Sequence, residues 1–115
     1  GRRLRAAVAA EPFMGAGTGR FDTRVMERLG TRVFCKVGAE AVYCATFPDR
    51  GWGLALKIDD GATARAAEVA MAAAIEACVA LSDDEAAFVR SLSDLTLRNW
   101  RGTEVGALRA TDRLR

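Results

Sequence analysis

The sequence predicts an α+β fold in which a three-stranded antiparallel meander is flanked by helices. Two features of the 115-residue chain predict it. Strand-like runs follow one another at 32–37, 41–47 and 52–58, and the gaps between them are too short for parallel crossovers. An alanine-rich segment then repeats apolar residues at helical spacing. Together these features predict a small sheet with a helix packed across it.

Helices are expected before the sheet. The segment 2–11 has helical periodicity, and Pro12 ends it because proline removes a backbone donor and restricts the residue before it. A second helix is expected over 21–30, with Asp22 or Thr23 as its N-cap. These helices would lead the chain into the first strand.

Helices and one weaker strand are expected after the sheet. Over 62–80, apolar side chains recur at 4-3-4-3 spacing on one helical face: Ala67, Met71, Ala74, Cys78 and Leu81. Ser82 and Glu85 have the residue types of a capping box, which predicts a short helix to about Ser91. A weak strand is expected at 103–108.

These elements form one domain spanning 1–115, because the length suits a single domain. Its parts are a helical lead-in at 1–30, the antiparallel strands at 31–60, helices at 61–91 and a tail at 92–115. No internal repeat or low-complexity linker divides them.

Composition excludes several classes of function. A net charge of +2 is too small to indicate nucleic acid or a membrane surface as partner. The chain has no histidine, which excludes a Ser–His–Asp triad, a Cys–His pair and a His-ligated zinc site within it. Its three cysteines form no CxxC pair, which favours free thiols in a reducing, cytoplasmic compartment. No metal site is expected within this chain.

Lys36 is the candidate that stands out, since the chain has fifteen arginines and only two lysines. If Ala39 and Glu40 form a two-residue hairpin turn, Lys36 lies opposite Tyr43 on a partly apolar face, and Cys35 lies opposite Cys44. Desolvation there would lower the pKa of the lysine and suit it to proton transfer. The alternative is a lysine that protects the exposed edge of a sheet. On spacing alone, this alternative is favoured.

Two glycine segments are weaker candidates. Gly38 is either a turn residue at positive φ or a gap through which a ligand approaches the strand, with the next N–H aimed at an oxyanion. The stretch GTGR places Gly17 and Arg20 where backbone donors and a guanidinium would hold a carboxylate. An ordinary connector is the favoured interpretation of GTGR. The second lysine, Lys57, is interpreted as a solvated strand residue.

Three longer stretches carry a resemblance to a known family: GAGTGRFDTRVME, KVGAEAVYCATFPDRGWGLALKIDDGATARAAEVA and NWRGTEVGALR. Together they resemble the bacterial L-asparaginases of the rhizobial thermolabile type. The most specific part is the block from Lys36 to Ala67, with its K-x-G-A-E core and its strand and turn GLALKIDDG.

The resemblance implies a serine β-lactamase or penicillin-binding-protein-like fold, of which this chain would be the C-terminal third. Lys36, Val37 and Gly38 would then stand where those enzymes have K-[ST]-G, with Val37 replacing the hydroxyl residue. It implies that Lys36 is catalytic, that the Ala39 N–H belongs to an oxyanion hole, and that Gly38 and Glu40 lie at the substrate.

The family's S-x-x-K nucleophile would lie upstream, since none of the three serines here has a lysine three residues on. The resemblance also implies zinc in a full-length member but no cofactor in this chain. The chain would thus be part of an enzyme that hydrolyses asparagine to aspartate and ammonia, inactive alone.

Expected partners are the amide substrate, the missing N-terminal segment and a second copy of the chain, because a partial fold would expose an apolar patch. The competing interpretation is a small α+β binding or structural domain without catalysis.

Overall fold

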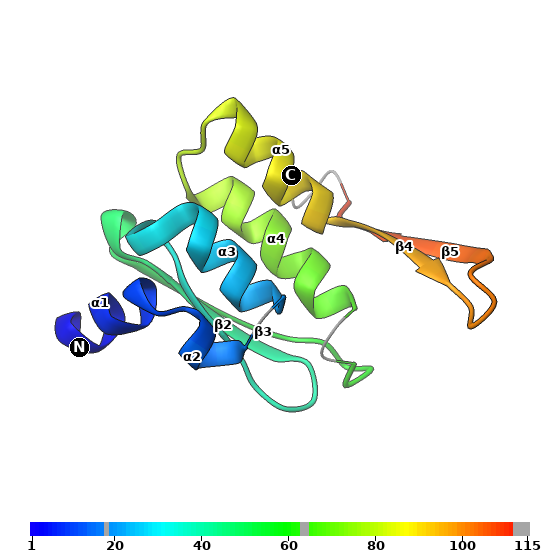
Figure 1. The fold of residues 1–115 in the computed structure, drawn as a ribbon, viewed down its shortest axis with the longest axis horizontal. Helices are drawn as coiled ribbons and strands as arrows, with labels where there is room; N and C mark the ends of the chain where they lie inside the picture. The colour runs from blue at the N-terminus through cyan, green and yellow to red at the C-terminus, as the bar shows by residue number, and fades with distance from the viewer. Residues whose placement is uncertain (18, 63–64, 112–115) are drawn as a thin grey trace.

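The computed structural model describes residues 1–17, 19–62 and 65–111. The fold contains a three-stranded antiparallel sheet, a two-stranded antiparallel sheet and several helices (Figure 1). In chain order the elements are α1 (Arg2–Ala10), α2 (Phe13–Ala16), α3 (Phe21–Leu29), η1 (Gly30–Arg32), β1 (Phe34–Val37), β2 (Val42–Phe47), η2 (Pro48–Arg50), β3 (Trp52–Lys57), α4 (Ala66–Cys78), α5 (Asp83–Leu92), β4 (Asp94–Arg98) and β5 (Glu104–Arg109).

The α+β class and the antiparallel meander are confirmed. The first sheet has the order β1-β2-β3, and both neighbouring pairs are antiparallel. Each strand therefore pairs with the next one along the chain, as the short connections require. The strand β1 lies at one edge of this sheet and β3 at the other.

The predicted register between β1 and β2 is wrong by one residue. Lys36 lies opposite Cys44, and Tyr43 lies opposite Val37. The cause is the turn, because the Gly38 N–H donates to the Val42 carbonyl at 2.7 Å and closes a three-residue loop. A one-residue slip changes which side chains share a face. Lys36 and Tyr43 consequently point to opposite faces of the sheet.

Helices α3 and α4 cover one face of this sheet, and α5 packs beside α4 (Figure 1). The central strand contributes alternate buried side chains to that face: Tyr43, Ala45 and Phe47. They meet a core that α3 and α4 complete with Val25, Met26, Met71 and Ile75. The buried surface of α4 is wider than the predicted stripe, because the helix contacts both the sheet and α5.

The lead-in differs from the prediction in several details. Helix α1 ends at Ala10, one residue before the predicted end, and the short helix α2 was not predicted. The N-cap of α3 is Arg20, and neither Asp22 nor Thr23 caps the helix. The Thr23 hydroxyl instead donates to the Gly17 carbonyl at 2.6 Å. The Asp22 carboxylate leaves its own helix to bond the sheet, as described below.

The tail forms a hairpin that leaves the body of the molecule (Figure 1). The strand β5 was expected, whereas its partner β4 was not. The Asn99 side chain accepts the Arg101 and Thr103 N–H groups and shapes the turn, beside a fully exposed Trp100. The residues of β4 alternate between polar and apolar, a strand signal that sequence reasoning missed, and Leu95 and Leu97 lie half-buried on one face.

The predicted capping box at the start of α5 is confirmed. The Glu85 N–H donates to the Ser82 hydroxyl at 3.3 Å, and the Ser82 N–H donates to the Glu85 carboxylate at 3.0 Å. Arg32 also donates to this carboxylate and ties η1 to α5. These bonds lower the pKa of Glu85 to about 2, and the bond from Arg32 has the largest effect.

Glu85→Gln is expected to reduce the loss of folding stability that the protein shows as the pH falls. Because the folded pKa lies below the ordinary value of 4.5, the carboxylate stabilises the fold above that value. This contribution is lost as the pH falls toward about 2. In urea unfolding at about pH 6 and about pH 2.5, the wild type should lose more stability than E85Q. Equal losses would show that Glu85 does not act as the acid-sensitive group.

Candidate functional site

One end of the three-stranded sheet gathers the predicted site segments. The N-terminus of α3, the turn between β1 and β2, and the N-terminus of α4 all lie at this end (Figure 1). Electrostatic interactions link two of these segments, since Glu68 of α4 interacts with Arg20 and Asp22 at the start of α3. The structure thus brings Gly17, Gly19 and Arg20 to the same end of the sheet as the Lys36 motif.

Lys36 is an exposed residue of the edge strand β1. Its Nζ donates to the Val37 carbonyl at 3.0 Å. The expected neighbourhood with Tyr43 is wrong, because Tyr43 lies on the buried face. The desolvation that this neighbourhood would supply is therefore absent. In this structure, Lys36 presents its ammonium group to solvent at the edge of the sheet.

A buried carboxylate lies directly behind this edge, and sequence reasoning assigned it only a capping role. The Asp22 side chain is 1% exposed. It accepts a 2.6 Å hydrogen bond from the Tyr43 hydroxyl and a 3.0 Å bond from the Val37 N–H. Burial, together with the bond to Asp22 and its charge, raises the pKa of Tyr43. The phenol therefore keeps its proton and remains a donor.

The turn after Lys36 has an unusual backbone. Glu40 and Ala41 both have φ of 56°, a region that residues other than glycine rarely adopt. Gly38 does not have positive φ, so its interpretation as a left-handed turn residue is wrong. Such conformations persist only where surrounding contacts impose them.

Two contacts hold this turn from the side of β3. Lys57 donates from Nζ to the Glu40 carbonyl, and the Ile58 N–H donates to the Ala41 carbonyl at 3.1 Å. Lys57 is exposed but is more than a solvated strand residue. The N–H of Ala39 forms no hydrogen bond within the part of the chain that the structure describes, and Ala39 is exposed.

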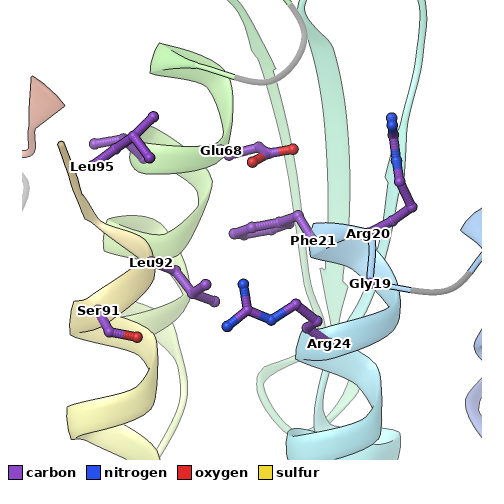
Figure 2. A pocket seen from close by; sticks show the side chains of 9 residues that line it. Gly19, Arg20, Phe21, Arg24, Glu68, Ser91, Leu92 and Leu95 are labelled. Atoms are coloured by element: carbon purple, nitrogen blue, oxygen red, sulfur yellow. The ribbon is translucent and has the colours of Figure 1, made fainter. Parts of the chain in front are cut away.

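A cavity of about 270 Å³ opens between α3, α4 and the end of α5 (Figure 2). Gly19, Arg20, Arg24 and Glu68 line it together with Phe21, Val69, Ser91, Leu92 and Leu95. Figure 2 shows Glu68 and Phe21 facing each other, while Arg20 points away from Arg24. Lys36, Gly38, Ala39, Glu40 and Gly17 do not line this cavity.

The cavity holds charges of both signs. Burial raises the pKa of Glu68, and the Asp22 charge adds to this, whereas Arg20 and Arg24 act in the opposite direction. Arg24 also lies over the Phe88 ring, 5.7 Å from its centroid. Sequence reasoning missed Glu68 because it reads as an ordinary helix residue; its partners lie more than forty positions away along the chain.

The cysteines do not form a reactive site. Cys35 lies opposite Ala45 on the buried face, whereas Cys44 is exposed on the other face; both are free, as is Cys78. Burial raises the pKa of Cys35, which keeps it a neutral thiol. The expectation that Cys35 and Cys44 are directly opposite is wrong for the same reason as the lysine register, namely the longer turn.

The described residues bring no three His, Cys, Asp or Glu side chains together as a metal site. A zinc ion of the kind implied by the resemblance therefore has no ligand set within 1–17, 19–62 and 65–111. Over the same residues, none of the helices combines the length and apolar character needed to span a bilayer.

The chain matches one family in a comparison with models of protein families. The family model described as L-asparaginase II matches residues 1–110. The chain belongs to this family. Its asparaginase-like function and an amide substrate such as asparagine follow from that membership. The match includes α3, the Lys36 turn, β3 and α4, so the family region contains every candidate residue described above. A comparison with curated proteins found no match.

Proposed function

We propose that the chain is the C-terminal portion of an L-asparaginase with a serine β-lactamase-like fold, acting in the cytoplasm. The family match over residues 1–110 is the observation that supports the asparaginase activity. The resemblance of Lys36, Val37 and Gly38 to a K-[ST]-G motif is the reason for proposing the fold and the C-terminal position. A serine outside residues 1–115 attacks the side-chain amide carbon of asparagine, and ammonia leaves. Water then hydrolyses the acyl-enzyme, which releases aspartate and regenerates the serine.

The side chains of this chain support a nucleophile from elsewhere. The Ser82 hydroxyl caps α5, while the Ser91 and Ser93 hydroxyls donate to the Phe88 and Arg90 carbonyls at 2.6 and 3.0 Å. All three are thus bonded to the backbone of α5. The buried, neutral Cys35 is equally unsuited to nucleophilic attack.

The residues at the sheet end supply the remaining roles. Lys36 orients or protonates groups near the serine or binds the substrate carboxylate. The Ala39 N–H donates to the oxyanion, because it is exposed and has no acceptor among the described residues. Arg20 and Gly17 hold the α-carboxylate, and Gly38 and Glu40 border the substrate. No step requires zinc from this chain.

The test is release of ammonia from asparagine by the complete polypeptide that the gene encodes, compared with residues 1–115 alone. The complete polypeptide should hydrolyse asparagine and form an acyl-enzyme visible by mass spectrometry, whereas residues 1–115 should be inactive. A complete polypeptide that folds but releases no ammonia from asparagine or glutamine would overturn the proposal. It would favour the non-catalytic binding or structural domain.

Exposed apolar side chains are the observation behind an expected protein partner. Leu4, Phe13 and Met14 are exposed on the two N-terminal helices, and Val42, Trp52, Trp100 and Val105 are exposed on or beside the strands. We infer that the N-terminal segment of the protein, or a second copy of the chain, covers some of these side chains. Residues 1–115 alone should then self-associate in light scattering, and a monomer at all concentrations would contradict this.

Gly38→Ala is expected to leave the fold intact and to impair substrate binding. An added Cβ would meet the nearest atom, the Val42 Cβ, at 3.4 Å, and φ at this position does not demand glycine. The added methyl would instead stand at the exposed turn beside the Ala39 N–H. The KM for asparagine should rise by about tenfold with an unchanged melting temperature. An unchanged KM would show that Gly38 does not border the substrate.

A further inference from the structure

The Asp22 carboxylate is a buried group that the reaction above does not use. It lies in the first turn of α3, yet it forms no capping bond with that helix. Its two oxygens instead accept hydrogen bonds from two strands, Oδ1 from the Tyr43 hydroxyl and Oδ2 from the Val37 N–H. The carboxylate therefore joins α3, β1 and β2 at one point.

The Val37 N–H belongs to the free edge of the sheet. Its neighbour Gly38 donates its own N–H across the ladder to Val42, at 2.7 Å. Because successive N–H groups of an antiparallel edge strand alternate in direction, the Val37 N–H points away from β2. An unpaired edge N–H would otherwise bond water or another strand. Asp22 is the acceptor that fixes it.

The residues joined in this way flank the proposed catalytic groups. Lys36 and Gly38 are the sequence neighbours of Val37, and Lys36 Nζ bonds the Val37 carbonyl at 3.0 Å. Arg20 precedes Asp22 by two residues at the start of the same helix. A displacement of Val37 relative to Asp22 would therefore move the Lys36 motif relative to Arg20.

The second bond restrains the carboxylate itself. Tyr43 is 1% exposed, and its ring contacts Phe21 edge-on with centroids 5.7 Å apart. The phenol is thus held by packing and aims its hydroxyl at Asp22 at 2.6 Å. Asp22 is therefore restrained on both sides.

From this geometry we infer that Asp22 is a positioning residue, which holds the Lys36–Val37–Gly38 edge in register with the N-terminus of α3 for substrate binding and catalysis. The inference rests on the proposed function for its catalytic consequence. Asp22 does not contact the substrate; it acts through the Val37 N–H. Its structural consequence, the fixed position of β1, can be measured without any activity.

The test compares Asp22→Ala, Asp22→Asn and Tyr43→Phe in the complete polypeptide, with Ser82→Ala as the control. Asp22→Ala removes both acceptors, whereas Asp22→Asn keeps one oxygen for the Val37 N–H and can donate to Tyr43. Tyr43→Phe removes only the bond from β2. Ser82→Ala destabilises the protein by removing the α5 cap, which lies away from this site.

In Asp22→Ala, exchange of the Val37 amide proton should rise at least about tenfold. The kcat for asparagine should fall by about 10–100-fold with KM changed by less than about threefold. Asp22→Asn and Tyr43→Phe should keep the Val37 amide protected and kcat within about threefold of wild type. Ser82→Ala should lower the melting temperature without changing either quantity.

The inference would be overturned if the Val37 amide proton of Asp22→Ala exchanged at the wild-type rate. It would also be overturned if Asp22→Ala lost no more kcat than Ser82→Ala. If Asp22→Ala does not fold, Asp22→Asn decides instead, since a large loss of kcat with a protected Val37 amide would overturn it. If the wild-type polypeptide does not hydrolyse asparagine, the proposed function fails, and the exchange rates alone decide whether Asp22 fixes the strand edge.

Discussion

Replacing Lys36 by methionine in the complete polypeptide is expected to lower the turnover of asparagine by about 10²–10⁴-fold, the usual effect of losing one acid–base participant. The fold should be preserved, because Lys36 is exposed and its side chain bonds the carbonyl of the neighbouring Val37. The unfolding free energy should change by less than about 0.5 kcal/mol, as is usual for surface substitutions. Steady-state kinetics and urea unfolding of the same preparation measure the two effects separately.

The structure changes the choice of control for this experiment. Lys57→Ala is unsuitable, because Lys57 bonds the Glu40 carbonyl in the turn that carries the Ala39 N–H. Arg101→Met removes an exposed cation from the tip of the β4–β5 hairpin and should retain wild-type turnover. If Lys36→Met unfolds normally and hydrolyses asparagine at the wild-type rate, Lys36 only protects the sheet edge.

The largest effect on stability is expected for Phe47→Ala. Phe47 ends the central strand, is 1% exposed and belongs to the core between the sheet and the helices. Truncating a buried phenylalanine typically lowers the unfolding free energy by about 3–5 kcal/mol through lost burial and a cavity. A domain of this size typically has about 5–15 kcal/mol in total, so the variant should unfold at markedly lower urea concentration.

Trp52→Ala provides the matched control. Trp52 lies directly opposite Phe47 in the β2–β3 ladder but is 54% exposed, and Arg50 lies over its ring. Its truncation removes an aromatic side chain from the same row of the sheet without opening a sealed cavity. Trp52→Ala should lower the free energy of unfolding by less than half as much as Phe47→Ala. Equal decreases would contradict the assignment of Phe47 to the core.

The elements themselves could be predicted from local sequence. Short gaps between β1, β2 and β3 permit antiparallel neighbours only, and this result does not depend on distant residues. The capping box joins Ser82 and Glu85, which are only three residues apart, so it could be predicted from local sequence. The strand β4 also carries a local signal, because its residues alternate between polar and apolar, but the run is only five residues long and follows α5 almost directly.

The register of β1 and the contacts around it were decided by the tertiary structure. A two-residue turn at 39–40 fits the sequence, but Glu40 and Ala41 adopt positive φ, and no local preference of these residues predicts that conformation. Contacts from another strand accompany it, with Lys57 on the Glu40 carbonyl. The resulting loop of three residues places Lys36 in solvent and Tyr43 in the core.

The candidate site divides in the same way. Lys36, Gly38 and Arg20 could be assigned to family-like segments from the residue types and their order alone. The contacts that hold these residues could not, because Asp22 bonds Val37 and Tyr43 across 15 and 21 positions of the chain. A carboxylate in the first turn of a helix reads locally as a cap; the strand edge that folds against α3 supplies the donor that redirects it.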